Sequence, residues 1–205
     1  MTRTNNALFI LFLFASLLVA TACIFIAMPN GTSVEAINLP ENPKELTAPA
    51  PVRVYVAENG SVRRTENGLI YCDDIPLSDG WQCYTQDVCK RYGVDYCLML
   101  GLMETESSFR EDADSGWAYG LCQIGYINED ELASLGMNIY TNEGNIEAGC
   151  YLLSDLLSRH SVSESLMAYN MGEYGAEELW EQGITESQYS RDVLLAAEKW
   201  KKILR

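Results

Sequence analysis

The stretch from residue 98 to residue 124 constrains the fold more than any other part of this sequence. It opens with a dense run of large apolar residues: Met99, Leu100, Leu102 and Met103. A helix that is apolar on most of its sides has to be buried, so the other helices of the domain must pack around this one. At the end of the run the polarity reverses abruptly, at Glu104 and Glu106. The sequence therefore predicts a central helix that ends in carboxylates.

Glu106 is the candidate catalytic residue of this helix. Two residues that are two positions apart on a helix point about 200° away from each other, so Glu104 and Glu106 cannot share a face. Desolvation at the mouth of a buried helix raises the pKa of a carboxyl group toward neutral pH. A general acid has to carry its proton at the start of the reaction, so we predict a raised pKa for Glu106.

Three short motifs follow one another along the chain. They read Glu106-Ser107-Ser108-Phe109 with Ala113, then Gly120-Leu121-Cys122-Gln123-Ile124, then Ala168-Tyr169-Asn170-Met171-Gly172. In this order and at this spacing, they resemble the motifs of the lytic transglycosylase SLT family across about residues 75–200. The resemblance implies a mostly α-helical, lysozyme-like lobe that binds peptidoglycan glycan strands and cleaves them.

The resemblance also implies a reaction in which one glutamate does the acid and the base work. In that family the glutamate protonates the glycosidic oxygen between MurNAc and GlcNAc and then deprotonates the C6 hydroxyl, which closes a 1,6-anhydroMurNAc ring. A hydrolytic muramidase would instead need a second carboxylate, and Asp112 and Asp114 in the next loop are the candidates for it. A scaffold that binds the wall without cleaving it is a third reading.

The substrate-binding residues are likewise implied by the resemblance. They are Ser107, Tyr119, Gln123, Tyr169, Asn170 and Tyr189. Four of them have a plain structural alternative: the Ser107 hydroxyl could bond to a preceding carbonyl, Tyr119 could simply pack, and Tyr169 and Asn170 could be a packed aromatic at a capped helix end. The chain also departs from the family at three places: Trp117 stands near the usual glycine, Glu111 replaces the usual proline, and Cys122 replaces the usual methionine.

The N-terminal part of the sequence predicts a membrane anchor. Residues 7–28 form an uncharged, apolar run of 22 residues, which is long enough to cross a bilayer core of about 30 Å. Arg3 precedes the run and Glu35 follows it, so we expect residues 1–6 in the cytoplasm and the rest outside a bacterial cell membrane, with a single pass. A signal peptide ending at Ala20-Thr21-Ala22 and a lipoprotein cysteine at Cys23 remain alternatives.

Between the anchor and the helical domain the chain changes character twice. Residues 29–51 hold five of the six prolines and show no periodicity, so we expect a linker there. Residues 52–71 alternate valine with polar residues around Asn59-Gly60, which predicts a small β-hairpin. The catalytic domain is expected over residues 72–205.

Apolar spacing and capping residues predict the helices of this domain. Ser78 begins the first, Gly93 ends it, and the helix carrying Glu106 comes next. The expected ranges of the others are 128–135, 145–159, 163–171, 177–181 and 188–205. His160, the only histidine, follows a helix, where a cation would favourably cap the C-terminal end of the dipole.

Charge and cysteine content limit the partners. A formal net charge of −15 disfavours nucleic acid and anionic membrane surfaces. Six cysteines follow Cys23 and could form up to three disulfides, with Cys89 and Cys97 as a candidate pair, or could be buried thiols. With one histidine and no Cys-x-x-Cys, no metal or cofactor is expected. Local wall opening for a secretion or conjugation complex would be compatible with this plan.

Overall fold

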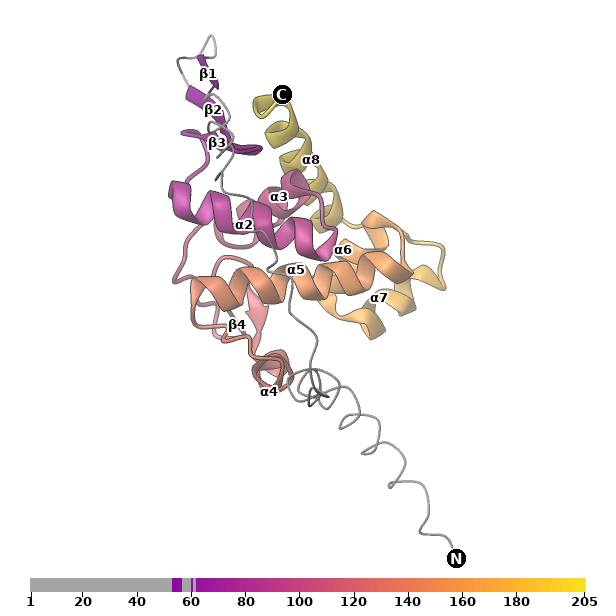
Figure 1. The fold of residues 1–205 in the computed structure, drawn as a ribbon. Helices are drawn as coiled ribbons and strands as arrows, with labels where there is room; N and C mark the ends of the chain where they lie inside the picture. Colours follow the sequence, from indigo (N-terminus) through magenta and orange to yellow (C-terminus); the bar gives the residue numbers. More distant parts are fainter. Residues whose placement is uncertain (1–52, 57–59, 61) are drawn as a thin grey trace, which may run out of the picture. The chain divides into compact units, whose positions relative to one another are not determined.

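The computed structural model describes residues 53–56, 60 and 62–205 (Figure 1). The predicted anchor at 7–28 and the linker at 29–51 lie outside the described residues, so both remain predictions. In the part of the chain that is described, no helix combines the length and apolar character needed to span a membrane.

The described chain is mostly helical, as predicted. Its helices are α2 (Asp79–Tyr92), α3 (Tyr96–Ser107), η1 (Tyr126–Asn128), α4 (Glu129–Ser134), α5 (Asn142–Arg159), α6 (Val162–Met171), α7 (Glu173–Trp180) and α8 (Gln188–Ile203). Its strands are β1 (Arg53–Val56), β2 (Val62–Glu66), β3 (Leu69–Cys72), β4 (Ala118–Tyr119) and β5 (Ile124–Gly125).

Helix α3 is the buried centre of the domain. Met99, Leu100, Leu102 and Met103 all have 0% exposure. Helix α8 crosses α3 closely at Gly101, where a Cβ atom would lie 2.6 Å from the Val193 carbonyl oxygen. The apolar run therefore has the central position predicted for it, and a glycine within the run permits the close approach of a second helix.

Capping residues set the helix ends largely as predicted. The Ser78 hydroxyl accepts a hydrogen bond from the Trp81 N–H, and Gly93 ends α2 in the left-handed conformation. Two helices begin earlier than expected, α5 after its N-cap Thr141 and α7 directly after Gly172. The prediction began each helix at its apolar periodicity, but the first turns of these helices contain polar residues or glycine.

The predicted β-hairpin at 52–71 is one part of a three-stranded antiparallel sheet ordered β1-β2-β3. A second turn, Asn67-Gly68, has positive φ at both residues and connects β2 to β3. Two side chains of α2 bind the β3 backbone: the Gln86 amide pairs with both the N–H and the C=O of Ile70, and the Gln82 amide does the same with Cys72. These bonds attach the sheet to the helical domain.

The cysteines differ from the prediction. All six in the described chain are free thiols, so no disulfide joins Cys89 to Cys97. Cys89 instead faces Cys150 of α5, with 3.8 Å between their Sγ atoms. Sequence proximity suggested the first pair, but Cys89 points from α2 into the core whereas Cys97 is only half-buried.

Candidate active site

Glu106 lies in the last turn of α3 and is half-buried. Its Oε1 accepts a hydrogen bond from the Tyr189 hydroxyl, which comes from the start of α8. Burial raises the pKa of the Glu106 carboxyl above its ordinary value, and the Tyr189 hydrogen bond offsets part of that rise. The C-terminal end of a helix dipole also disfavours a carboxylate. The site therefore favours the protonated form of a carboxyl group that is still partly exposed.

Glu104 faces a different environment, as its spacing from Glu106 predicts. Its carboxylate pairs with the Lys199 ammonium of α8, with 2.6 Å between Nζ and Oε2. Glu104 is therefore not free to act as a second carboxylate beside Glu106.

The backbone that leaves Glu106 turns sharply. Ser108 and Phe109 both adopt positive φ, at 53° and 61°. Phe109 is buried edge-to-face against Trp200, with ring centroids 5.7 Å apart, and this packing holds the turn. Gln123 in the second motif also has positive φ, at 46°. Non-glycine residues in this conformation are costly and gather at functional sites in folded proteins.

The side chain of Ser107 is buried, and its predicted role in substrate binding remains a prediction. It is 2% exposed, and its hydroxyl lies 3.0 Å from the Met103 carbonyl oxygen and 2.8 Å from that of Leu121. The bond to Met103 is the one expected if Ser107 has a structural role, because it joins the hydroxyl to a preceding carbonyl of the same helix. The second ties the end of α3 to the Gly120–Gln123 turn, so Ser107 positions one motif against the other.

The second motif forms the turn of a short hairpin, in which β4 pairs with β5. Asn145 of α5, which sequence reasoning did not single out, holds this turn. Its Nδ2 donates to the Tyr119 and Ile139 carbonyls, and its Oδ1 accepts from the Cys122 N–H. A Cβ atom at Gly120 would lie 2.4 Å from the Asn145 Nδ2, which excludes a side chain there. The sequence signal that could have identified Asn145 is a polar residue at the start of an otherwise apolar helix face.

Gln123 uses its amide N–H groups within its own loop. Nε2 donates to the Ala113 carbonyl at 2.9 Å and to the Gly120 carbonyl at 3.0 Å. Both donor bonds of the Gln123 amide therefore go to the backbone, and its Oε1 is the atom that can accept a hydrogen bond from a ligand.

The third motif brings its tyrosine to the site. The Tyr169 hydroxyl donates to the Cys122 carbonyl at 2.8 Å, and burial raises its pKa beside Glu106 and Tyr189. Asn170 follows at the end of α6 and is exposed. The structure thus brings Glu106, Tyr169 and Tyr189 close together. Ser107 and Gln123 instead hydrogen-bond to backbone carbonyls of the second motif and the loop before it.

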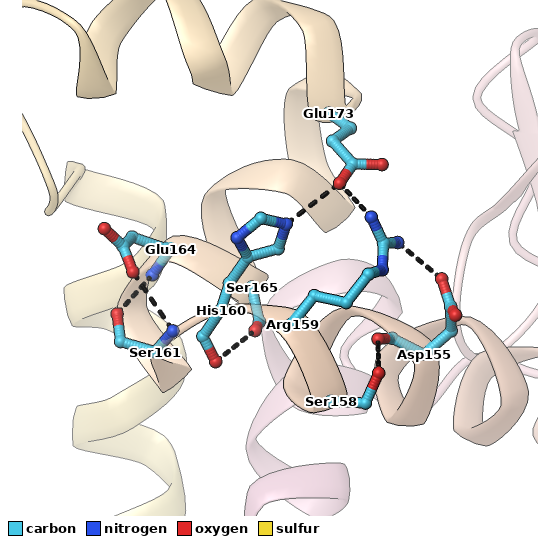
Figure 2. A network of polar contacts seen from close by, with 8 residues as sticks. All are labelled: Asp155, Ser158, Arg159, His160, Ser161, Glu164, Ser165 and Glu173. Carbon is cyan, nitrogen blue, oxygen red and sulfur yellow. Dashed lines mark hydrogen bonds and ion pairs between the residues drawn. The ribbon is translucent and has the colours of Figure 1, made fainter.

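His160 is the C-cap of α5, as predicted, and takes part in a polar network (Figure 2). Its Nε2 lies 2.9 Å from the Oε1 of Glu173, the first residue of α7, and Arg159 pairs with the same carboxylate. His160 lowers the pKa of Glu173, with Arg159 contributing in the same direction. In the described part of the chain, no three His, Cys, Asp or Glu residues cluster in a way that could hold a metal ion.

A known protein family matches the part of the chain that contains these residues. The sequence profile of the family described as Transglycosylase SLT domain matches residues 84–189. No curated protein matches the chain.

Two similar solved structures are lytic transglycosylases. One is an inactive mutant of the lytic transglycosylase Slt from Pseudomonas aeruginosa, 21% identical, with a TM-score of 0.53 over 63% of this chain and 25% of that one. The other is the 70 kDa soluble lytic transglycosylase from Escherichia coli, 18% identical, with a TM-score of 0.49 over 58% of this chain and 24% of that one. This chain therefore spans only about a quarter of each, and the first likeness shows a shared fold.

Proposed function

Because this chain belongs to the Transglycosylase SLT domain family, we propose that it is a lytic transglycosylase of peptidoglycan. The bond it would cleave is the β-1,4 linkage between MurNAc and GlcNAc, with 1,6-anhydroMurNAc as the new end. No cofactor enters this scheme.

In the proposed reaction Glu106 acts first as the acid. Its protonated carboxyl donates a proton to the glycosidic oxygen, the bond from that oxygen to C1 of MurNAc breaks, and the N-acetyl group of the sugar stabilises C1. The resulting Glu106 carboxylate then removes the proton of the C6 hydroxyl, and O6 bonds to C1. The glutamate returns to its starting state and no water is consumed.

The surrounding side chains suit these two steps. The Tyr189 hydroxyl donates to the Glu106 carboxyl, and this bond strengthens when the carboxylate forms. Tyr169 holds the Cys122 carbonyl and so fixes the wall of the site opposite α3. Asn170 and the free Oε1 of Gln123 are available for the acetamido and hydroxyl groups of the sugar.

The observation that carries the proposal is the half-buried Glu106 carboxyl, whose pKa burial raises, while the carboxylates of Glu104 and Asp114 already have partners. Glu104 pairs with Lys199. Asp114 accepts hydrogen bonds from the Tyr126 hydroxyl and the Gly116 N–H, which lower its pKa. Double-carboxylate glycosidases need a second group at a set distance from the first.

Mass spectrometry of the soluble products tests the chemistry. The full chain, purified in mild detergent, is incubated with peptidoglycan beside Glu106→Gln and the matched control Glu104→Gln. We expect products one water lighter than reducing-end muropeptides from the wild type and the control, and none from Glu106→Gln. Ordinary reducing ends would instead identify a muramidase using Asp112 or Asp114, and no products from any folded sample would indicate a non-catalytic scaffold.

We also propose that residues 7–28 anchor the domain outside a bacterial cell membrane, where it opens the wall locally for a secretion or conjugation complex. The uncharged run and its flanking charges support this arrangement. Carbonate extraction and protease protection of native membranes would test the anchor, and release of the protein in soluble form would contradict it. Failure to co-purify with a membrane complex at native expression would contradict the partner.

A further inference from the structure

Four aromatic side chains gather beside the second motif. We call Trp117, Tyr119, Tyr126 and Tyr140 the aromatic platform. They come from the β4–β5 hairpin, from η1 and from the loop before α5. Only Tyr119 entered the sequence-based site, so the platform is a feature that the proposed chemistry does not use.

The hairpin register places three of these residues on one face. Tyr119 pairs with Ile124, and the Tyr126 N–H donates to the Trp117 carbonyl at 2.9 Å, which extends the antiparallel pairing by one step. Trp117 is therefore opposite Tyr126 and two positions from Tyr119. Residues opposite each other, or two apart, project from the same side of a hairpin.

Tyr140 completes the platform and stiffens it. Its ring centroid is 5.2 Å from that of Tyr119, edge to face, and 6.3 Å from that of Tyr126, stacked with 30° between the planes. Carboxylates fix the hydroxyls: Tyr126 donates to Asp114 at 2.8 Å and Tyr140 to Glu129 at 2.9 Å. The rings are held in place before any ligand arrives.

Folding does not account for Trp117. Its side chain is 84% exposed, and Ile127 just beyond it on η1 is 94% exposed. An exposed apolar side chain that shares a face with other aromatic residues, as Trp117 does with Tyr119 and Tyr126, marks a binding surface more often than an isolated one does. A surface hollow is lined by Glu129, Ala133 and residues 136–139, and Glu129 is also the hydrogen-bond acceptor of Tyr140.

The platform is separated from the candidate active site by only a few residues of the chain. Tyr119 is three residues from Cys122, whose carbonyl binds Tyr169 beside Glu106. Three residues of chain reach about 10 Å at most, so one extended ligand can contact both places. Asn145 fixes the intervening turn through the Tyr119 carbonyl and the Cys122 N–H.

We propose that the aromatic platform is a second saccharide subsite, where a sugar ring of the same glycan strand stacks at a distance from the cleaved bond. A pyranose presents an apolar C–H face and a polar rim, which suits rigid aromatic faces edged by acceptors. The carboxylates of Asp114 and Glu129 accept hydrogen bonds from neutral hydroxyl and amide groups and repel anionic ligands. The inference rests on the proposed function for the identity of the strand.

The test measures glycan binding without turnover. The full chain carrying Glu106→Gln is titrated calorimetrically with a six-residue GlcNAc oligomer, alone and with Trp117→Ala, Trp117→Phe or Leu195→Ala. Leu195 is 70% exposed on α8 and is the matched control. We expect Trp117→Ala to weaken binding about 10-fold, Trp117→Phe less than threefold, and Leu195→Ala not at all.

A kinetic arm separates the subsite from the chemistry. In the active chain, Trp117→Ala should raise KM for isolated glycan strands about 10-fold and leave kcat within twofold, because it removes binding away from the reacting bond. Unchanged affinity in the titration, or a fall in kcat alone, would overturn the subsite.

Sedimentation of the same samples identifies another occupant. If Trp117→Ala abolishes self-association and leaves glycan affinity unchanged, the platform is an interface between copies and the proposal fails. A wild type that binds the oligomer through Trp117 but yields no anhydro products would refute the proposed function and retain the subsite.

Discussion

Two glutamates at helix ends show how position decides the charge of the same side chain. Glu106 lies in the last turn of α3, half-buried, and burial raises its pKa. Glu173 is the first residue of α7, and the side chains of His160 and Arg159 lower its pKa (Figure 2). Each carboxyl has a hydrogen bond to a ring-bearing side chain that lowers its pKa, but at Glu106 burial outweighs that bond and at Glu173 it does not.

Desolvation raises the pKa at both places, but helix polarity and neighbouring charged or polar groups act in opposite directions. The α3 end offers Glu106 no cation and points a negative dipole end at it, while the α7 start offers Glu173 a positive dipole end, the Arg159 guanidinium and the His160 ring. One carboxyl is therefore kept as an acid and the other as a structural anion. The following predictions test that contrast, beginning with the largest effect.

Neutralising the two carboxyls should have very different effects on activity. We expect Glu106→Gln to lower the rate of glycan cleavage about 1,000-fold, since general acid and base catalysis contributes about 10²–10⁴. Glu173→Gln should leave the rate within about threefold, because its carboxylate serves the contact between α5 and α7. Release of soluble muropeptides measures both, and a comparable loss from Glu173→Gln would break the contrast.

Tyr189→Phe should remove the hydrogen bond that offsets the effect of burial on Glu106. Without the hydroxyl, the pKa of Glu106 rises further, so the alkaline limb of the kcat profile moves to higher pH. The carboxylate formed on proton donation also loses a hydrogen bond, which lowers kcat about 10- to 100-fold. A pH–rate profile from pH 4 to 9 measures both effects, and an unshifted limb would exclude Tyr189 from this role.

The two glycines of the corresponding helices should respond differently to alanine. Gly101→Ala places a Cβ 2.6 Å from the Val193 carbonyl, so α8 must move away from α3, at a cost of about 1–3 kcal/mol of unfolding free energy. Gly175→Ala in α7 meets nothing closer than 3.6 Å and should be neutral or stabilise by up to about 1 kcal/mol. Urea denaturation compares them, and equal stabilities would contradict the close packing around α3.

The pH dependence of stability should have opposite signs for the two carboxyls. The raised pKa of Glu106 means that its favourable contribution is complete below about pH 4.5 and is lost as pH rises through the folded-state value, so Glu106→Gln gains on the wild type toward high pH. The lowered pKa of Glu173 means that its contribution is present above about pH 4.5 and is lost on acidification.

Glu173→Gln should therefore cost less than about 1 kcal/mol at neutral pH and nothing in acid, because this partly exposed group is screened by solvent. Unfolding free energies measured from pH 3 to 8 for both variants and the wild type provide the check. Parallel curves for the two variants would contradict the opposite pKa directions.

Local sequence patterns were informative wherever the structure depends on neighbours within a turn or two. Ser78, Gly93 and His160 cap helices as predicted, and the run before Glu106 is the buried centre. The family motifs also identified Glu106, Tyr169 and Tyr189, which the fold brings together.

Other features depend on partners far away in the chain. The inward hydroxyl of Ser107 needs the Leu121 carbonyl, and the Gly120–Gln123 turn needs Asn145. Cys89 meets Cys150, 61 residues later, and not Cys97. No periodicity or spacing rule predicts these pairings, because each forms only when the helices and loops pack together.

By itself, then, the sequence determined the helices, their caps and the acid at the end of a buried helix, because these follow from hydrogen bonds and apolar faces within a few residues. Only the tertiary structure decided which polar groups surround that acid. Burial raises the pKa of Glu106, and the packing of α5 against the hairpin sets the wall beside it and the aromatic platform. Desolvation is a property of the assembled fold and cannot be read from one segment.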